Sequence, residues 1–198
     1  MIQDIAPLHL NNQYQKRQPA PSDYVLAFRE NAVCMHKSLP EGGEDGENSG
    51  LKQFPERLEF PTFEEMQDWC GGQKRPLPAL IYLFEIGGKS FFLADLPEGV
   101  AEGRKSSGAG SSDTEPGQGE ASEVSCHEYV RMFDIRRMRP KELVLAAATA
   151  WHLYLWYRDN RFCGRCGHPT EQDGKLRMLR CPACGNMIFP KIAPAVIV

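Results

Sequence analysis

Short runs of apolar residues, broken by polar or glycine positions, dominate the first hundred residues and predict β-hairpins. Residues 23–38 form two runs rich in Val, Phe and Leu on either side of a polar break at residues 29–31. Residues 79–96 form two longer β-prone runs that flank Gly87 and Gly88. Because two-residue hairpin turns need positive φ angles, which glycine adopts readily, the second hairpin is the more strongly predicted.

Helical signals lie in two places. Thr62 is followed three residues later by Glu65, which is the spacing of a capping box and predicts a short helix that starts there. Further along, apolar residues recur at helical spacing from Leu143 to Tyr157, shortly after Pro140, a residue that favours the start of a helix. Because apolar side chains cover most of this second helix, we expect it to be largely buried.

Two segments between these elements are poor in apolar residues. Residues 41–50 are mostly Gly and acidic side chains and predict a loop, whereas residues 98–125 are rich in Gly, Ser and Glu and predict a disordered insertion. The 198-residue chain, which is 41% hydrophobic and 25% charged, is long enough for one core and a satellite module. The longest nearly apolar stretch, residues 143–157, falls short of the roughly 20 residues of a bilayer span, so we expect no membrane segment.

Four cysteines near the C-terminus carry the strongest chemical signal. Two Cys-x2-Cys pairs are separated by fourteen residues, and a glycine follows each pair. Paired knuckles of this kind hold four thiolates tetrahedrally around Zn²⁺ at about 2.3 Å. The predicted ligands are Cys163, Cys166, Cys181 and Cys184. Four thiolates leave no open position for water, so the zinc is expected to be structural; iron, or His168 in place of one thiolate, is the less favoured alternative.

The other three cysteines bear on the cellular compartment and on whether the chain has a catalytic thiol. The chain has seven cysteines, and Cys34, Cys70 and Cys126 have no paired spacing. This usage fits a reducing compartment, and the N-terminus lacks the features of a secretory signal, so we expect a cytoplasmic protein. Cys126 beside His127 resembles a nucleophile with its base, but neighbours on a strand point to opposite faces, which disfavours catalysis there.

Residues 158–191 form a basic segment within an acidic chain. They carry seven basic and three acidic side chains, whereas the whole protein has a formal net charge of −3. This basic character is compatible with contacts to phosphate groups and also with solubility alone. The aromatic residues of the preceding helix, among them Trp151, Tyr154 and Tyr157, are compatible with a stacking site but favour a role in the core.

Two stretches carry a family resemblance. The sequence WHLYLWYRDNRFCGRCGHP, followed by CPACGNMIFPKIAPAVIV, resembles the junction of zinc ribbon and catalytic domain in the NADH pyrophosphatases, which are Nudix hydrolases. The match is specific from about Phe133 to Val198, and ALIYLFEIGGKSFFLAD is similar to the N-terminal hairpin of the family. The resemblance implies hydrolysis of NAD(H) to a nicotinamide mononucleotide and AMP, action on NAD-capped RNA, Mg²⁺ or Mn²⁺ in the catalytic domain, and a homodimer.

Several departures limit what the resemblance implies. A Tyr that contacts substrate in the family is here Phe189, which keeps the ring and loses the hydroxyl, and a Glu that holds substrate is here Leu176. The glutamate-rich catalytic signature of the Nudix domain, whose carboxylates hold the divalent ions, occurs nowhere in the sequence. The apolar run 195–198 at the chain end suggests a protein that stops at the entrance to its catalytic domain.

The sequence therefore predicts an α+β chain in four parts. These are an N-terminal, rudimentary Nudix-like α/β domain (1–139), a linking helix (140–160), a small four-cysteine zinc ribbon (161–190) and the first strand of a Nudix domain (191–198). The predicted function is that of the non-catalytic part of an NAD(H) pyrophosphatase, inactive alone, with Phe189 in contact with substrate. The alternative is a stand-alone zinc-ribbon module that binds nucleotide, RNA or protein without hydrolysis.

Overall fold

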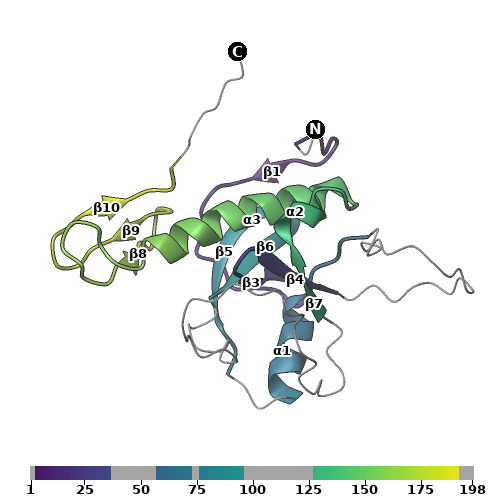
Figure 1. Cartoon of the computed structure of the whole chain (residues 1–198), viewed down its shortest axis with the longest axis horizontal. Helices are drawn as coiled ribbons and strands as arrows, with labels where there is room; N and C mark the ends of the chain where they lie inside the picture. The colour runs from purple at the N-terminus through teal and green to yellow at the C-terminus, as the bar shows by residue number, and fades with distance from the viewer. Residues whose placement is uncertain (1–2, 37–56, 73–75, 96–126, 192–198) are drawn as a thin grey trace, which may run out of the picture.

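The computed structural model describes residues 3–36, 57–72, 76–95 and 127–191. Figure 1 shows a mixed α+β body in which the long helix α3 lies across the strands, with a small unit of three strands at one end of this helix. The predicted loop, the predicted insertion and the predicted C-terminal strand lie outside the described residues.

The larger sheet has the strand order β1-β5-β6-β2. Its strands are β1 (Leu10–Asn11), β5 (Ala79–Ile86), β6 (Lys89–Asp95) and β2 (Tyr24–Leu26). β5 and β6 are antiparallel and turn at Gly87 and Gly88, whose φ angles are 56° and 79°. The second predicted hairpin is therefore confirmed, with glycine at the two positions that require it.

A second sheet has the order β3-β4-β7. Its strands are β3 (Phe28–Arg29), β4 (Ala32–His36) and β7 (His127–Arg131). β3 and β4 form a hairpin that turns at Glu30 and Asn31, as the polar break predicts. The first residues of the predicted hairpin do not belong to it. They form β2, which pairs in parallel with β6 in the larger sheet. Val25 and Leu26 are fully buried there, as expected for a strand covered on both faces.

Both predicted helices are present. The structure has α1 (Phe63–Gly72), a short α2 (Met132–Ile135) and α3 (Lys141–Asp159). The capping box of α1 is reciprocal: the N–H of Thr62 donates to Glu65 Oε2 at 2.8 Å, and the N–H of Glu65 donates to Thr62 Oγ1 at 3.3 Å. Pro140 is the N-cap residue of α3, where the sequence predicts the helix to begin.

One side of α3 packs on β5 and β6. Its buried residues are Leu143, Val144, Ala146, Ala147, Ala150 and Leu153. Further along, Trp151 and Tyr154 pack on Phe28 with ring centroids 5.3 and 5.1 Å away, which confirms the core role of these aromatic residues. Leu155 and Trp156 remain partly exposed, so the expected burial of the helix holds for one side only. Among the described residues, no helix is long and apolar enough to cross a membrane.

Candidate metal centre

The two Cys-x2-Cys pairs form two turns of the same construction. The N–H of Gly167 donates to the carbonyl of Cys163 at 2.8 Å, and the N–H of Gly185 donates to the carbonyl of Cys181 at 3.0 Å. The N–H of each first cysteine donates in turn to the carbonyl five residues ahead, at 2.8 and 2.9 Å. Both glycines have positive φ angles, 75° and 70°, which explains why a glycine follows each pair.

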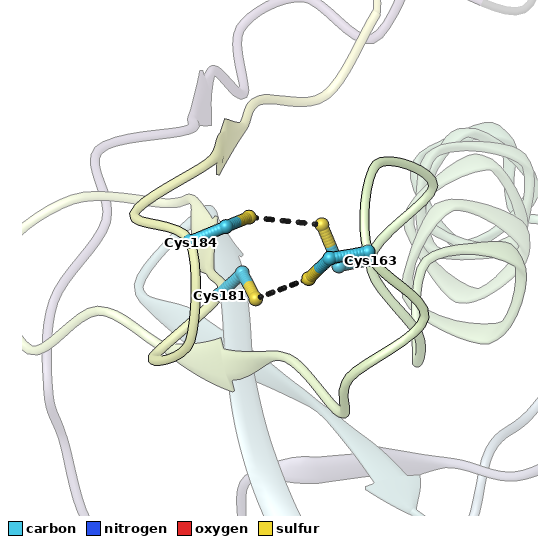
Figure 2. Close-up of side chains that lie close together, drawn as sticks. Cys163, Cys181 and Cys184 are labelled. Atoms are coloured by element: carbon cyan, nitrogen blue, oxygen red, sulfur yellow. Dashed lines mark hydrogen bonds between the residues drawn. The ribbon is translucent and has the colours of Figure 1, made fainter.

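The two turns face each other and bring four sulfur atoms together. All four Sγ atoms lie within 4.8 Å of one another. The distance from Cys163 to Cys184 is 3.7 Å, and that from Cys166 to Cys181 is 3.4 Å. Figure 2 shows Cys181 and Cys184 on one loop pointing toward Cys163 on the other. A tetrahedral zinc with bonds of about 2.3 Å requires sulfur atoms about 3.8 Å apart, so the cluster fits one such ion.

Backbone donors favour the ionised form of at least one sulfur. The N–H of Arg165 donates to Cys163 Sγ at 3.4 Å and is the largest cause of a pKa lowered to about 6 for this thiol. For Cys166 the N–H of His168 acts in the same direction, but hydrogen bonds with the neighbouring thiols raise its pKa to about 12. The pKa values of Cys163 and Cys166 are thus shifted in opposite directions, and a divalent ion would replace the protons of the cluster.

The predicted alternative ligand lies outside this cluster. His168 is exposed, and its Nδ1 lies 3.3 Å from the carbonyl oxygen of Cys166. Within the part of the chain that the structure describes, the four cysteines are the one group of three or more potential ligands that converge. Cys34 and Cys70 are buried elsewhere in the core, and Cys126 lies outside the described residues. The geometry therefore favours four thiolates over three thiolates and an imidazole.

The three-stranded unit that holds the cysteines is attached to the larger sheet by Arg177. This unit consists of β8 (Glu171–Gln172), β9 (Leu179–Arg180) and β10 (Met187–Ile188), in the order β10-β9-β8. Nη2 of Arg177 donates to the carbonyl of Leu83 in β5, and its guanidinium lies 5.6 Å from the ring centroid of Tyr14. The hydroxyl of Tyr14 donates to the carbonyl of Asp173 at 3.1 Å. The hydrogen bond to Leu83 gives Arg177 a structural role, whereas its sequence context indicated only a basic surface, and burial lowers its pKa.

The outer surface of the unit is apolar as well as basic. Phe162, Leu176 and Met187 are 64%, 54% and 54% exposed, and Phe189, which follows β10, is 50% exposed. The ring of Phe189 is thus accessible, while the predicted loss of a carboxylate at Leu176 leaves an exposed aliphatic side chain. Single exposed apolar residues are ordinary on protein surfaces.

Comparison with known proteins identifies this class of module. Residues 158–189 match the family described as the NADH pyrophosphatase zinc ribbon domain. The chain is 41% identical over 59 residues to the NAD-capped RNA hydrolase NudC of Deinococcus radiodurans, covering 30% of this chain and 21% of that protein. It is 32% identical over 74 residues to the NAD-capped RNA hydrolase NudC of Salmonella typhimurium, covering 36% of this chain and 29% of that protein.

The site and these matches together define a four-cysteine zinc ribbon of the structural type. More particularly, residues 158–189 are similar to the zinc ribbon of the NADH pyrophosphatases, in agreement with the resemblance in the sequence. The chain spans less than a third of the length of the curated relatives that it matches.

Proposed function

We propose that this protein is the non-catalytic, zinc-stabilised part of an NAD(H) pyrophosphatase, the activity that converts NAD(H) to a nicotinamide mononucleotide and AMP. The observation that carries the proposal is the convergence of four sulfur atoms within a segment that matches this family's zinc ribbon. In this proposal Cys163, Cys166, Cys181 and Cys184 hold one structural Zn²⁺. The 198 residues contain no Nudix signature, so the Mg²⁺ or Mn²⁺ of the reaction belongs to a catalytic domain outside them.

The proposal keeps the four-part division of the chain, in which residues 1–139 are a rudimentary Nudix-like domain and residues 161–190 the ribbon. It also keeps the cytoplasm as its compartment, which the spacing of the cysteines in the sequence supports. The names of the relatives support NAD-capped RNA as a substrate of the complete enzyme. Phe189 supplies a ring that stacks on the nucleotide, and its half-exposed position supports this role.

The proposed homodimer forms through the C-terminal half of the chain. Four of the five most exposed large apolar side chains among the described residues lie on the ribbon: Phe162, Leu176, Met187 and Phe189. Burial of such side chains between two copies would remove apolar area from water at about 25 cal/mol per Å². The apolar side of α3 cannot serve this purpose, because it already packs on the sheet.

A nucleotide assay tests the proposed function. NADH incubated with the protein and Mg²⁺ or Mn²⁺ is expected to survive, because the sequence lacks the glutamate-rich Nudix signature that holds the catalytic ions. NADH is nevertheless expected to bind, and Phe189→Ala should weaken this binding about 5- to 150-fold, the range for loss of one base–aromatic stack. Calorimetric titration measures the affinity, and chromatography of the products measures AMP.

Two controls make the assay specific. Met187→Ala removes a similarly exposed apolar side chain two residues away, in β10, and should leave NADH affinity unchanged. Phe189→Ala should change the free energy of unfolding by less than about 0.5 kcal/mol, as expected for an exposed position. Release of AMP in proportion to protein, above a metal-stripped control, would contradict the predicted lack of activity. Equal losses of affinity in both variants would contradict the role of Phe189.

A further inference from the structure

An open hollow of about 580 Å³ lies at the N-terminal end of α3, far from the zinc ribbon along the chain. It is lined by Arg57, Arg137, Arg139 and Pro140. Arg57 comes from a segment some eighty residues earlier in the sequence and pairs with Arg139 in a short parallel bridge. The N–H of Leu58 donates to the carbonyl of Arg139 and holds the two segments together. The fold thus brings Arg57 beside Arg137 and Arg139, from which the sequence separates it.

The arginines of this hollow form no ion pair within the described part of the chain, although Glu59 and Glu142 lie a few residues from them in the sequence. Among the described residues, no acidic side chain lies within ion-pair distance of Arg57, Arg137 or Arg139, and all three are exposed. The neighbouring cations differ, since Arg131 pairs with Asp134 at 2.9 Å and Lys141 has Asp4 at 3.9 Å. Arginine stays protonated at all physiological pH values, so three permanent cations share one concave surface in a protein of net negative charge.

An exposed aromatic side chain lies in α2, a few residues before Arg137. Phe133 is 60% exposed, and the guanidinium of Arg136 lies 3.8 Å from the centroid of its ring. Arg136 directly precedes Arg137 of the hollow. A flat, exposed pair of this kind offers stacking surface for a base, while adjacent guanidinium groups offer paired donors for phosphate oxygens. Aromatic and basic groups together are the composition of surfaces that bind single-stranded nucleic acid.

We propose that the hollow formed by Arg57, Arg137 and Arg139 binds the phosphate groups of a single-stranded nucleic acid, with the Phe133–Arg136 pair in contact with its bases. The choice of RNA among phosphate ligands rests on the proposed function, whereas the convergence of the arginines does not. The 19 residues of α3 separate this hollow from the ribbon by about 28 Å along the helix. The site is therefore distinct from Phe189 and would hold the body of an RNA away from the nucleotide at its end.

Salt titration of RNA binding tests the proposal quantitatively. Each phosphate that an arginine neutralises contributes about −0.7 to the slope of log affinity against log salt for a single strand. Three arginines thus contribute about −2, which amounts to a roughly 20-fold loss of affinity between about 50 and 200 mM salt. Arg57→Gln and Arg137→Gln should each lower the magnitude of the slope by about 0.7 and weaken binding at low salt.

The experiment uses a fluorescein-labelled oligouridylate and the full chain, with fluorescence anisotropy as the readout. Lys16→Gln is the matched control, because it removes one exposed positive charge outside the hollow and should leave the slope unchanged. Unchanged circular dichroism and zinc content would show that the variants are folded. Phe133→Ala should weaken binding without changing the slope, because it removes stacking and no charge.

Three outcomes would overturn the proposal. The first is an identical slope in the parent protein and in both arginine variants. The second is a decrease in slope and affinity in Lys16→Gln as large as that in the arginine variants. The third is binding of polyglutamate as tight as that of RNA and equally sensitive to Arg57→Gln, which would indicate an acidic protein partner. Inorganic pyrophosphate should compete only weakly, because it cannot contact all three arginines and the aromatic pair. Failure of NADH to bind at Phe189 would leave these results intact, so the two proposals fail separately.

Discussion

The substitution Cys181→Ser is the most direct perturbation of the zinc ribbon. Cys181 is completely buried, and its Sγ lies 3.4 Å from that of Cys166, at the centre of the cluster. Structural zinc sites of this kind contribute about 10–16 kcal/mol in apparent free energy at neutral pH. An equal share for each of four thiolates is about 2.5–4 kcal/mol, so the loss of one predicts zinc binding weakened roughly 60- to 700-fold.

The structure indicates why the ribbon depends on metal. Apart from the cysteines, the buried apolar residues of the ribbon among those described are Met178 and Leu179, and its strands are two residues long. Two such side chains contribute roughly 3–6 kcal/mol by burial, well below the share of the metal. Removal of zinc should therefore unfold the ribbon, while the core beneath α3 remains folded because its apolar cluster does not include the cysteines.

Two measurements check this prediction. Competition with a chromophoric chelator gives the zinc affinity of the parent protein and of Cys181→Ser, and elemental analysis should give one zinc per parent chain. Limited trypsin digestion should cleave the metal-stripped ribbon rapidly, including after Arg177, whose side chain is held against Leu83 in the folded protein. Cys34→Ala, at a buried cysteine of β4, should keep its zinc. Zinc content unchanged in Cys181→Ser, or a stripped ribbon that resists trypsin, would refute the reasoning.

Two further predictions concern stability and assembly. Glu65→Ala should lower the free energy of unfolding by about 1 kcal/mol in urea titrations, because it removes half of the capping box of α1. Partial burial raises the pKa of Glu65, but hydrogen bonds from Thr62 outweigh it and hold the pKa below 4.5. The stabilisation is thus present above pH 4.5 and is lost as the pH falls through the folded pKa. The free energies of unfolding of the parent protein and of Glu65→Ala should therefore converge in acid. A difference that stays constant with pH would exclude the carboxylate as the cause. The chain should sediment as a dimer at concentrations on the order of tens of micromolar, and a monomer there would require the catalytic domain to supply the contact.

Local signals in the sequence predicted the elements whose partners lie close along the chain. The glycine pair at Gly87 and Gly88, the capping box of Thr62 and Glu65, and the helix start at Pro140 all appear where expected. Each depends on backbone preferences or on hydrogen bonds that span a few residues. The cysteine pairs belong to the same category, because the Cys-x2-Cys-Gly turn is local and the affinity of thiolates for zinc brings the two turns together.

Contacts between distant segments were decided by the tertiary structure alone. β2 pairs in parallel with β6, although its sequence reads as part of the following hairpin. Val25 and Leu26 are buried in this position, and whether a strand is covered on both faces depends on the rest of the fold. Arg177 is a partly buried link to Leu83, and Arg57 lies beside the arginines before α3, yet each has the sequence appearance of an ordinary surface cation. A charged side chain carries no local signal of its partner. Its role is set by packing between segments far apart in the chain, where the free energy depends on the whole fold.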